Sequence, residues 1–267
     1  MSNKGFKTKK SLGQNFLKDQ IVIEKIADAS GCGPKDTVVE IGPGLGVLTD
    51  ALSERAGRVI AVELDDRLIP ILNTKFALRK NVEIVHEDIL RFDWSGVDPG
   101  EEGSLYIAGN LPYYITTPIL LGILEKKVPA KSITVMVQKE VADRIVAHPG
   151  GKDYGVLSIS LQYYAEARKV LDVPSECFDP RPKVDSAVVV LDLKEKRALE
   201  GAEEAKFFRL VKQAFMQRRK TLSNSLAGFC GRGKEEIEDI LTRNGIDPKR
   251  RAETLSLGEY IHLSKEI

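Results

Sequence analysis

The chain has 267 residues, of which 42% are hydrophobic and 30% charged, and its formal net charge is +1. It has no apolar run of about eighteen residues, so we expect no membrane-spanning helix but a soluble protein with one large core and a smaller second domain. A lysine-rich N-terminus without an apolar segment predicts a cytoplasmic rather than a secreted protein. Cys32, Cys177 and Cys230 are widely spaced and form no CxxC pair, which argues against a disulfide framework and a thiolate metal site.

The first predicted element is a basic segment over residues 1–18, which contains Lys4, Lys7, Lys9, Lys10 and Lys18. Asp19 is a candidate N-cap for the helix that follows, and Gly31 is expected to end it. The basic segment is typical of a surface that faces phosphate, although a solvated tail is the alternative.

Short β-branched or apolar runs then alternate with helix-length segments. The runs predict strands at 37–41, 59–64, 82–85, 105–108 and 133–137. The segments between them predict helices at 45–55, 67–76, 118–126 and 140–147. This alternation is typical of an α/β fold with a mostly parallel sheet built from βα units.

The second half of the chain is less regular. Residues 154–164 fit either a helix or an alternating strand, and we favour the helix. Residues 184–193 predict a strand that no crossover helix precedes, so we expect it to pair antiparallel at the end of the sheet. The charged stretch 194–204 suggests a boundary between domains 1–195 and 196–267. Apolar residues recur with a helical period beyond it, which predicts a small all-α domain.

A glycine-rich turn follows the first predicted strand. Gly42, Gly44 and Gly46 alternate in EIGPGLG, one residue shorter than the dinucleotide fingerprint GxGxxG. Because the glycine motif is one residue shorter than this fingerprint, it argues against a pyrophosphate ligand. Close backbone approach without an anion cradle favours S-adenosylmethionine, whose sulfonium is cationic. A tight turn in a protein that binds no nucleotide is the alternative.

Two carboxylates follow the next strands. Glu63 ends the second strand, where it can accept hydrogen bonds from ribose hydroxyls, and Asp88 follows the third, where it can accept from an adenine amine. Carboxyl ends of parallel strands share one edge of a sheet, so we expect both side chains to face the glycine turn. For Asp88, a cap or turn carboxylate is the alternative.

The segment Asn110-Leu111-Pro112-Tyr113 follows the fourth strand. The exocyclic amine of adenine is a poor nucleophile because its lone pair is delocalised into the ring. Hydrogen-bond acceptors on the amine hydrogens can localise that pair, and Asn110 with a backbone carbonyl held by the Pro112 turn supplies two. Tyr113 adds a stacking face. An ordinary turn between strand and loop is the alternative.

Together these motifs resemble the KsgA-type small-subunit rRNA adenine dimethyltransferases, a branch of the Rossmann-like class I methyltransferases. The resemblance covers nearly the whole chain. It rests on SLGQNFL (11–17), EIGPGLG (40–46), VELD (62–65), EDIL (87–90), NLPY (110–113), FDPRPKVDS (178–186) and QRRKTLSNSL (217–226).

The resemblance implies a role for residues outside the strands. Gln14, Asn15 and Leu17 would close over the cofactor, and Asn110 would lie between the cofactor and the target base. Phe178 would be a second stacking residue that sandwiches an extruded adenine with Tyr113. We expect Phe178 to be exposed because its loop is flanked by prolines, and a buried core phenylalanine is the alternative. No metal is implied.

An acid-free basic stretch in the C-terminal domain predicts contact with RNA phosphates. Its candidate residues are Lys206, Arg209, Lys212, Arg218, Arg219 and Lys220. An ordinary polar helix face is the alternative. We therefore expect a monomer that uses S-adenosylmethionine to dimethylate two adjacent adenines near the 3′ end of small-subunit rRNA during subunit assembly. Two other hypotheses stay open: an Erm-type large-subunit rRNA methyltransferase, and a non-catalytic ribosome-assembly or transcription factor.

Overall fold

A computed structural model describes residues 14–267 of the chain. The structure divides into two compact units. The first comprises the described residues up to Ala142 together with residues 167–193, and the second comprises residues 143–166 and 194–267. The division at Leu193 and Lys194 lies close to the boundary expected at residue 195. The helical segment 143–166, in contrast, belongs with the C-terminal helices. The limits of the two domains as functional parts stay a prediction.

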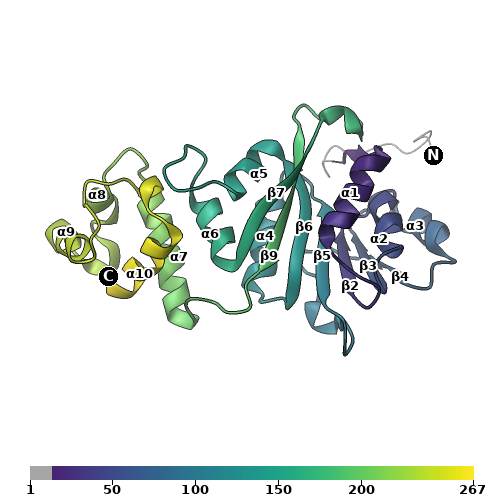
Figure 1. The fold of residues 1–267 in the computed structure, drawn as a ribbon, viewed down its shortest axis with the longest axis horizontal. Helices are drawn as coiled ribbons and strands as arrows, with labels where there is room; N and C mark the ends of the chain where they lie inside the picture. The colour runs from purple at the N-terminus through teal and green to yellow at the C-terminus, as the bar shows by residue number, and fades with distance from the viewer. Residues whose placement is uncertain (1–13) are drawn as a thin grey trace. The chain divides into compact units, whose positions relative to one another are not determined.

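The first unit is built on a seven-stranded sheet (Figure 1). Its strand order is β4-β3-β2-β5-β6-β9-β7. The strands are β2 (Thr37–Ile41), β3 (Arg58–Glu63), β4 (Val82–His86), β5 (Leu105–Asn110), β6 (Ala130–Gln138), β7 (Ala165–Val173) and β9 (Ser186–Leu193). The pairs from β4 to β6 are parallel, and β6 pairs with β9 antiparallel. The predicted α/β class and mostly parallel sheet are confirmed.

Helices connect these strands at nearly the predicted positions. They are α1 (Gln20–Ser30), α2 (Val47–Ser53), α3 (Ile69–Phe76), α4 (Thr116–Glu125), α5 (Lys139–Ile145) and α6 (Val156–Tyr164). Asp19 caps α1 through its Oδ1, which accepts a hydrogen bond from Val22 N at 3.1 Å, and Gly31 ends the helix at a φ of 70°. The helix favoured for residues 154–164 is confirmed by α6.

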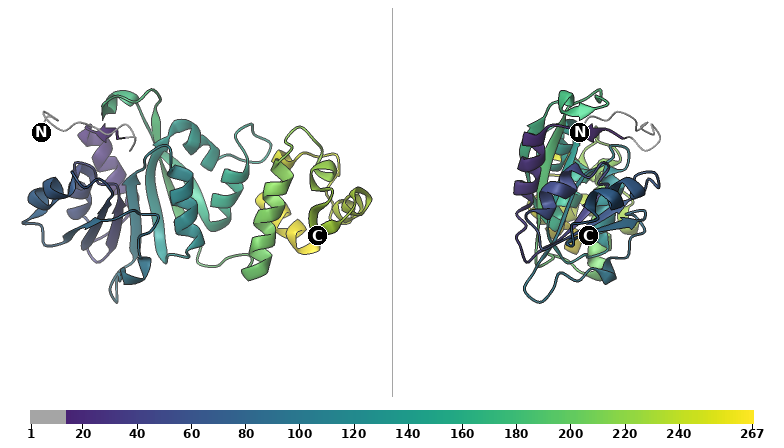
Figure 2. Two further views of the ribbon diagram at one scale, coloured as in Figure 1. Left: turned by 180° about the vertical axis from the view of Figure 1, so that it is seen from behind. Right: turned by 90° about the vertical axis from the view of Figure 1, so that its right-hand side faces the viewer.

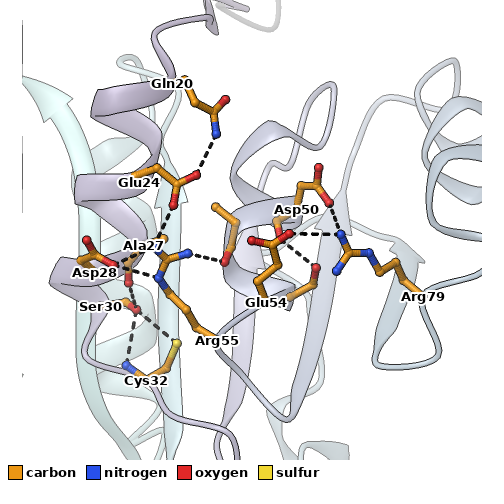
Figure 3. A network of polar contacts seen from close by, with 12 residues as sticks. Gln20, Glu24, Ala27, Asp28, Ser30, Cys32, Asp50, Glu54, Arg55 and Arg79 are labelled. Atoms are coloured by element: carbon orange, nitrogen blue, oxygen red, sulfur yellow. Dashed lines mark hydrogen bonds and ion pairs between the residues drawn. The ribbon is translucent and has the colours of Figure 1, made fainter.

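One core cluster joins α1 and α2 to the central strands. It includes Ile23 and Ile26 of α1, Leu52 of α2, Val38 of β2 and Tyr106 of β5. On the solvent side, Arg55 just after α2 donates to Glu24 and Asp28 of α1, at 2.7 Å from Nη2 to each (Figure 3). These exposed ion pairs orient α1 along α2, while the buried apolar contacts stabilise the packing.

The far edge of the sheet differs from the prediction. The strand over 184–193 does pair antiparallel, but β9 does not end the sheet, because β7 lies beyond it. Strand β7 was not among the predicted elements. Most of its residues are exposed or half-buried, as suits an edge strand, so its sequence lacks the apolar run that marks an inner strand.

Two very short strands join distant parts of the chain. Strand β1 (Phe16–Leu17) pairs antiparallel with β8 (Phe178–Asp179), with Leu17 opposite Phe178. The end of the motif SLGQNFL and the start of the motif FDPRPKVDS are thereby brought together. Neither strand could be predicted, because a two-residue ladder leaves no periodic signal.

The C-terminal part of the second unit contains helices only, as predicted (Figure 2). They are α7 (Gly201–Phe215), α8 (Leu222–Leu226), α9 (Lys234–Arg243) and α10 (Leu257–Glu266). A capping box begins α10, since Ser256 Oγ accepts from Glu259 N and Ser256 N donates to Glu259 Oε2. In residues 14–267, no helix has both the length and the apolar character needed to cross a membrane.

Candidate active site

A cleft lies where the parallel strands β2 to β5 end. Its lining includes the glycine turn after β2, Glu63 at the end of β3, Asp88 after β4 and Asn110 at the end of β5. Open α/β sheets bind ligands at this edge because their loops diverge there. The structure therefore places the separate sequence motifs around a single cleft.

The three glycines of the turn all have left-handed backbone angles. The φ values are 66° at Gly42, 58° at Gly44 and 70° at Gly46. A Cβ added at Gly42 would meet no atom within 4 Å, so this position leaves the cleft open to a close ligand. At Gly44 an added Cβ would lie 3.0 Å from Cε1 of Phe16. Gly42 and Gly44 both line the cleft.

Gly46 has a different role from the one predicted for it. It is not part of the cleft lining, and an added Cβ would lie 2.7 Å from Cε2 of Phe76 and 2.9 Å from Cδ2 of Leu72 on α3. The third glycine of the motif is therefore required for close packing of the turn against α3 rather than for space at a ligand.

Glu63 is held in place by the backbone around it. Its Oε2 accepts from Gly44 N at 3.0 Å and its Oε1 accepts from Asp65 N at 2.8 Å. The side chain is buried, and burial raises the pKa of the carboxyl although the backbone hydrogen bonds oppose this. Because each carboxylate oxygen can accept two hydrogen bonds, Glu63 can still receive two ligand hydroxyls.

Glu40 is a site residue that was not predicted from the sequence. It lines the cleft at 1% exposure, and its Oε2 has no hydrogen-bond partner within the described part of the chain. Burial raises the pKa of Glu40 to about 7, the charge of Glu63 adds to this, and Thr49 and Lys75 oppose it. An acidic residue inside a fully buried strand was the available sequence signal, because a buried carboxylate needs a partner or a ligand.

The charge of the lining is one-sided. Four carboxylates line the cleft, namely Glu40, Glu63, Glu87 and Asp88. Among the described residues of this lining there is no lysine, arginine or histidine. Such a cleft favours a ligand with positive charge and disfavours a phosphate.

Asp88 is a turn carboxylate that also lines the cleft. Its Oδ1 accepts from Leu90 N at 3.0 Å, and its backbone oxygen accepts from Phe92 N at 2.9 Å, so it organises the turn after β4. The half-buried side chain also lines the cleft. One carboxylate can do both, since it has about four acceptor positions.

The segment Asn110 to Tyr113 forms the opposite wall of the cleft. Asn110 Nδ2 donates to the backbone oxygen of Asn15 at 3.1 Å, which leaves its Oδ1 to act as an acceptor. The backbone oxygen of Pro112 accepts from Ile115 N at 3.1 Å and from Thr116 Oγ1 at 3.2 Å. Those two bonds already occupy the Pro112 oxygen, which makes it a poorer acceptor for a ligand.

Tyr113 is held through its side-chain hydroxyl. Its hydroxyl lies 2.6 Å from Ser186 Oγ at the start of β9, and burial raises the pKa of this phenol. The ring lines the cleft and is half-buried. Tyr114, which also lines the cleft, is 55% exposed. A ring fixed in this way suits stacking, because little rotamer entropy is lost when a ligand binds.

The expectation that Phe178 is exposed is wrong. Phe178 is 1% exposed, belongs to the core cluster that contains Leu17 and Ile26, and does not line the cleft. The physical reason is the pairing of β8 with β1, which encloses the side chain despite the flanking prolines. In this conformation Phe178 cannot stack on a ligand in the cleft.

The N-terminal residues predicted to cover the cofactor do line the cleft. They are Gln14, Asn15 and Leu17. Gln14 Nε2 donates to Asp65 Oδ2 at 2.8 Å, and Asp65 also binds Arg67 through charged hydrogen bonds. Arg67 and then Gln14 hold the pKa of the Asp65 carboxyl well below its usual range, although burial opposes them. The rest of the basic segment, residues 1–13, lies outside the described residues.

Of the six basic residues predicted to contact RNA phosphates, five are exposed and Lys206 is half-buried. Lys212 is on α7, and Arg218, Arg219 and Lys220 follow that helix. Arg218 differs from the others, because its Nη2 donates to the backbone oxygens of Lys152 at 3.1 Å and Tyr154 at 3.3 Å. Arg218 is therefore also a structural residue of the second unit.

Comparison with known proteins identifies the family. The profile of the family described as Ribosomal RNA adenine dimethylase matches residues 5–267. The chain belongs to this family. The resemblance inferred from the motifs is thus confirmed, and the chain is an enzyme of the rRNA adenine dimethylase type.

Two relatives match nearly the whole length of this chain. The chain is 48% identical to "Ribosomal RNA small subunit methyltransferase A" of Shouchella clausii, over 98% of this chain and 90% of the relative. The same identity holds for the protein of that name from Bacillus cytotoxicus, over 98% of this chain and 92% of the relative.

Two solved structures share the fold. A dimethyladenosine transferase from Plasmodium falciparum has a TM-score of 0.80 at 26% identity, over 93% of this chain and 95% of its own. The 23S rRNA methyltransferase ErmE has a TM-score of 0.73 at 28% identity, over 94% of this chain and 99% of its own. The fold is therefore shared with one enzyme named as a dimethyladenosine transferase and with one named for 23S rRNA methylation.

Proposed function

We propose that this enzyme transfers methyl groups from S-adenosylmethionine to the exocyclic amines of two adjacent adenines near the 3′ end of small-subunit rRNA. The observation that carries the proposal is the position of Asn110, which ends β5 at the same cleft as the glycine turn and the acidic lining. The 48% identity to proteins named for small-subunit rRNA methylation supports the choice of substrate.

The residues of the cleft fit S-adenosylmethionine. Glu63 would accept hydrogen bonds from the ribose hydroxyls, Asp88 would accept from the adenine amine of the cofactor, and Gly42 leaves room for close backbone approach. The acidic lining, which has no basic residue in the described part of the chain, matches a ligand with a sulfonium and an ammonium group. When bound, the cofactor supplies an electrophilic methyl group.

The other wall of the cleft fits the amine of the target base. Asn110 Oδ1 and Leu111 O would each accept one amine hydrogen, which localises the nitrogen lone pair for in-line attack. Tyr113 would stack on the base and is held for this by its bond to Ser186. Because Phe178 is buried, stacking in this conformation depends on Tyr113, and a sandwich would require Phe178 to leave the core.

We also propose that residues 196–267 bind the RNA. The exposed cations Lys212, Arg219 and Lys220 are free to contact phosphates, whereas Arg218 holds the segment around Tyr154. The enzyme would act as a monomer in the cytoplasm on an assembling small subunit.

Two other functions can be distinguished from the proposed one by measurement. An Erm-type enzyme would methylate large-subunit rRNA, and the structural similarity to ErmE makes this comparison necessary. Purified protein should incorporate labelled methyl groups into immature small subunits and not into large subunits. A non-catalytic assembly factor is tested by calorimetric titration with S-adenosylmethionine, because absence of binding would favour it over the enzyme.

A further inference from the structure

One aromatic side chain at the cleft has no part in the proposed mechanism. Tyr114 lines the cleft and is 55% exposed. Among the aromatic side chains of residues 14–267 it is the only exposed one, since all the others are buried or half-buried. A single exposed apolar side chain is ordinary on a protein surface, but tyrosine is enriched where proteins contact their ligands. Its position at the cleft makes Tyr114 a candidate for a contact with substrate.

The backbone on both sides of Tyr114 is fixed. Ile115 N donates to the backbone oxygen of Pro112 at 3.1 Å, which closes a four-residue turn with Tyr113 and Tyr114 as its central residues. Thr116 Oγ1 donates to the same oxygen at 3.2 Å, where α4 begins. The turn therefore holds the point from which the Tyr114 side chain projects.

The two central tyrosines of this turn differ in their contacts. The hydroxyl of Tyr113 is bound to Ser186, and its ring is half-buried. For Tyr114, no described residue forms a hydrogen bond with the hydroxyl or stacks on the ring. Its ring is therefore available to a ligand without the loss of a contact inside the protein.

The wall on which Tyr114 lies indicates which ligand it can contact. Glu63 and Asp88, which are assigned to the cofactor, belong to the ends of β3 and β4. Tyr114 follows β5, on the wall assigned to the target base. It is more exposed than Tyr113, so it lies closer to solvent, where the rest of the RNA strand must be when one base is inside the cleft.

The proposed substrate has two adjacent adenines. The cleft contains one Asn110 and one held ring at Tyr113, so one adenine reacts at a time. A base that leaves its strand removes a stacking surface from its neighbour. A protein ring can replace that surface, because every base has an aromatic face. Stacking needs no amine hydrogen, so the neighbour can be an unmodified or a dimethylated adenine.

We propose that Tyr114 stacks on the adenine next to the one in the cleft and thereby determines specificity for a pair of adjacent adenines. The inference rests on the proposed function, which supplies the substrate. The turn then holds both bases, with Tyr113 on the reacting adenine and Tyr114 on its neighbour. After the first adenine is dimethylated, the two bases can exchange positions and both contacts form again.

Methyl transfer to small subunits that lack the modification tests this contact. Tyr114→Leu keeps an apolar side chain but removes the ring, and it should lower kcat/KM for the subunit by about five- to a hundred-fold, as expected for one lost base stack. Tyr114→Phe keeps the ring and should keep most of the wild-type value. The dissociation constant of S-adenosylmethionine, measured by calorimetry, should be unchanged in both variants. Leu78→Ala is the control, since Leu78 is 95% exposed and does not line the cleft.

Competition between two kinds of subunit assigns the contact to the neighbouring base. One kind carries both adenines, and in the other kind one adenine is replaced by uracil, which has a smaller ring for stacking. Mass spectrometry of the rRNA measures methylation of the adenine that both kinds share. The wild-type enzyme should prefer the subunits in which the neighbour is adenine, and Tyr114→Leu should reduce this preference.

Four outcomes would overturn the inference. They are an unchanged kcat/KM in Tyr114→Leu, weaker S-adenosylmethionine binding by this variant, absence of a preference in the wild type, and full retention of the preference in Tyr114→Leu. If Tyr114→Leu does not fold, Tyr114→Gln replaces it in both measurements, since it also lacks the ring. Failure of the wild-type enzyme to methylate small subunits of either kind would instead refute the proposed function.

Discussion

The side-chain amide of Asn110 donates to the backbone oxygen of Asn15 at 3.1 Å, although the two residues are 95 positions apart. This bond links the end of β5 to the segment before β1. The residue proposed to activate the target base is thereby oriented by a segment proposed to cover the cofactor. Loss of order at residue 15 should therefore leave the Asn110 amide less well oriented and lower methyl transfer.

Glu63 should act mainly on cofactor affinity. In Glu63→Gln an NH2 group replaces one carboxylate oxygen. This donor then faces the N–H of Gly44 or Asp65 and a ribose hydroxyl, so the hydrogen bonds accepted by that oxygen are lost. Hydrogen bonds to charged acceptors contribute about 1.5–3 kcal/mol each, so we expect binding about ten- to a hundred-fold weaker. Calorimetric titration with S-adenosylmethionine measures this. Unchanged affinity would contradict the role assigned to Glu63, and Glu83→Gln serves as the exposed control.

Gly46 should matter for stability more than for cofactor binding. In Gly46→Ala the new Cβ would meet Phe76 and Leu72 at less than 3 Å, with a φ of 70°. Gly31 has the same φ but nothing within 4 Å of an added Cβ, so Gly31→Ala isolates the backbone strain. Overpacking should make Gly46→Ala less stable than Gly31→Ala by about 1–3 kcal/mol in the free energy of unfolding. Equal values from denaturant unfolding would rule out the packing role.

Glu40 should give the cofactor-free protein a distinct pH dependence. Its folded pKa is raised to about 7 from an ordinary value of 4.5. Its contribution to stability is therefore fully present below pH 4.5 and is lost as the pH rises through 7. Relative to Glu40→Gln, the wild type should lose up to about 3 kcal/mol in the free energy of unfolding between pH 5 and 8. Denaturant unfolding of both proteins across this range checks the difference, and a constant difference would show that the carboxyl does not titrate there.

The C-terminal cations should control binding to ribosomal subunits. The double change Arg219→Glu and Lys220→Glu should weaken subunit binding and reduce its salt dependence, by about one unit of logarithmic slope for each phosphate that is no longer neutralised. Arg243→Glu on α9 is a control with the same kind of charge change elsewhere in the second unit. Arg218 is unsuitable as a probe, since its substitution would also remove the hydrogen bonds to Lys152 and Tyr154. Equal salt slopes for the double variant and wild type would exclude phosphate binding at these positions.

Much of the fold could be predicted because its signals are local. The strands β2 to β6 are continuous β-branched or apolar runs, and because these strands run parallel, their carboxyl ends meet at the edge where the cleft lies. Edge strand β7 could not be predicted, because its exposed face carries charged residues that resemble a loop. The burial of Phe178 depends on a two-residue pairing with Leu17 that no local pattern shows.

The candidate site shows the same division. Glu63, Asp88 and Asn110 were predictable, because each polar residue lies at or just after the end of a strand. The unpaired oxygen of Glu40 was not, since whether a carboxylate inside a strand finds a partner depends on α2 and α3. Gly46 was assigned to the cofactor because it shares a motif with Gly42, but its role follows from the packing of α3 against it, which is a tertiary relationship.

The most direct test of the account is methyl transfer to small ribosomal subunits that lack the modification, followed by mass spectrometry of their rRNA. Wild-type enzyme should add two methyl groups to each of two adjacent adenines near the 3′ end. Asn110→Ala should abolish the transfer while S-adenosylmethionine affinity stays nearly intact, because the lone pair of the adenine amine is no longer localised. Full methylation by Asn110→Ala, or methyl groups found only on large-subunit rRNA, would contradict the account.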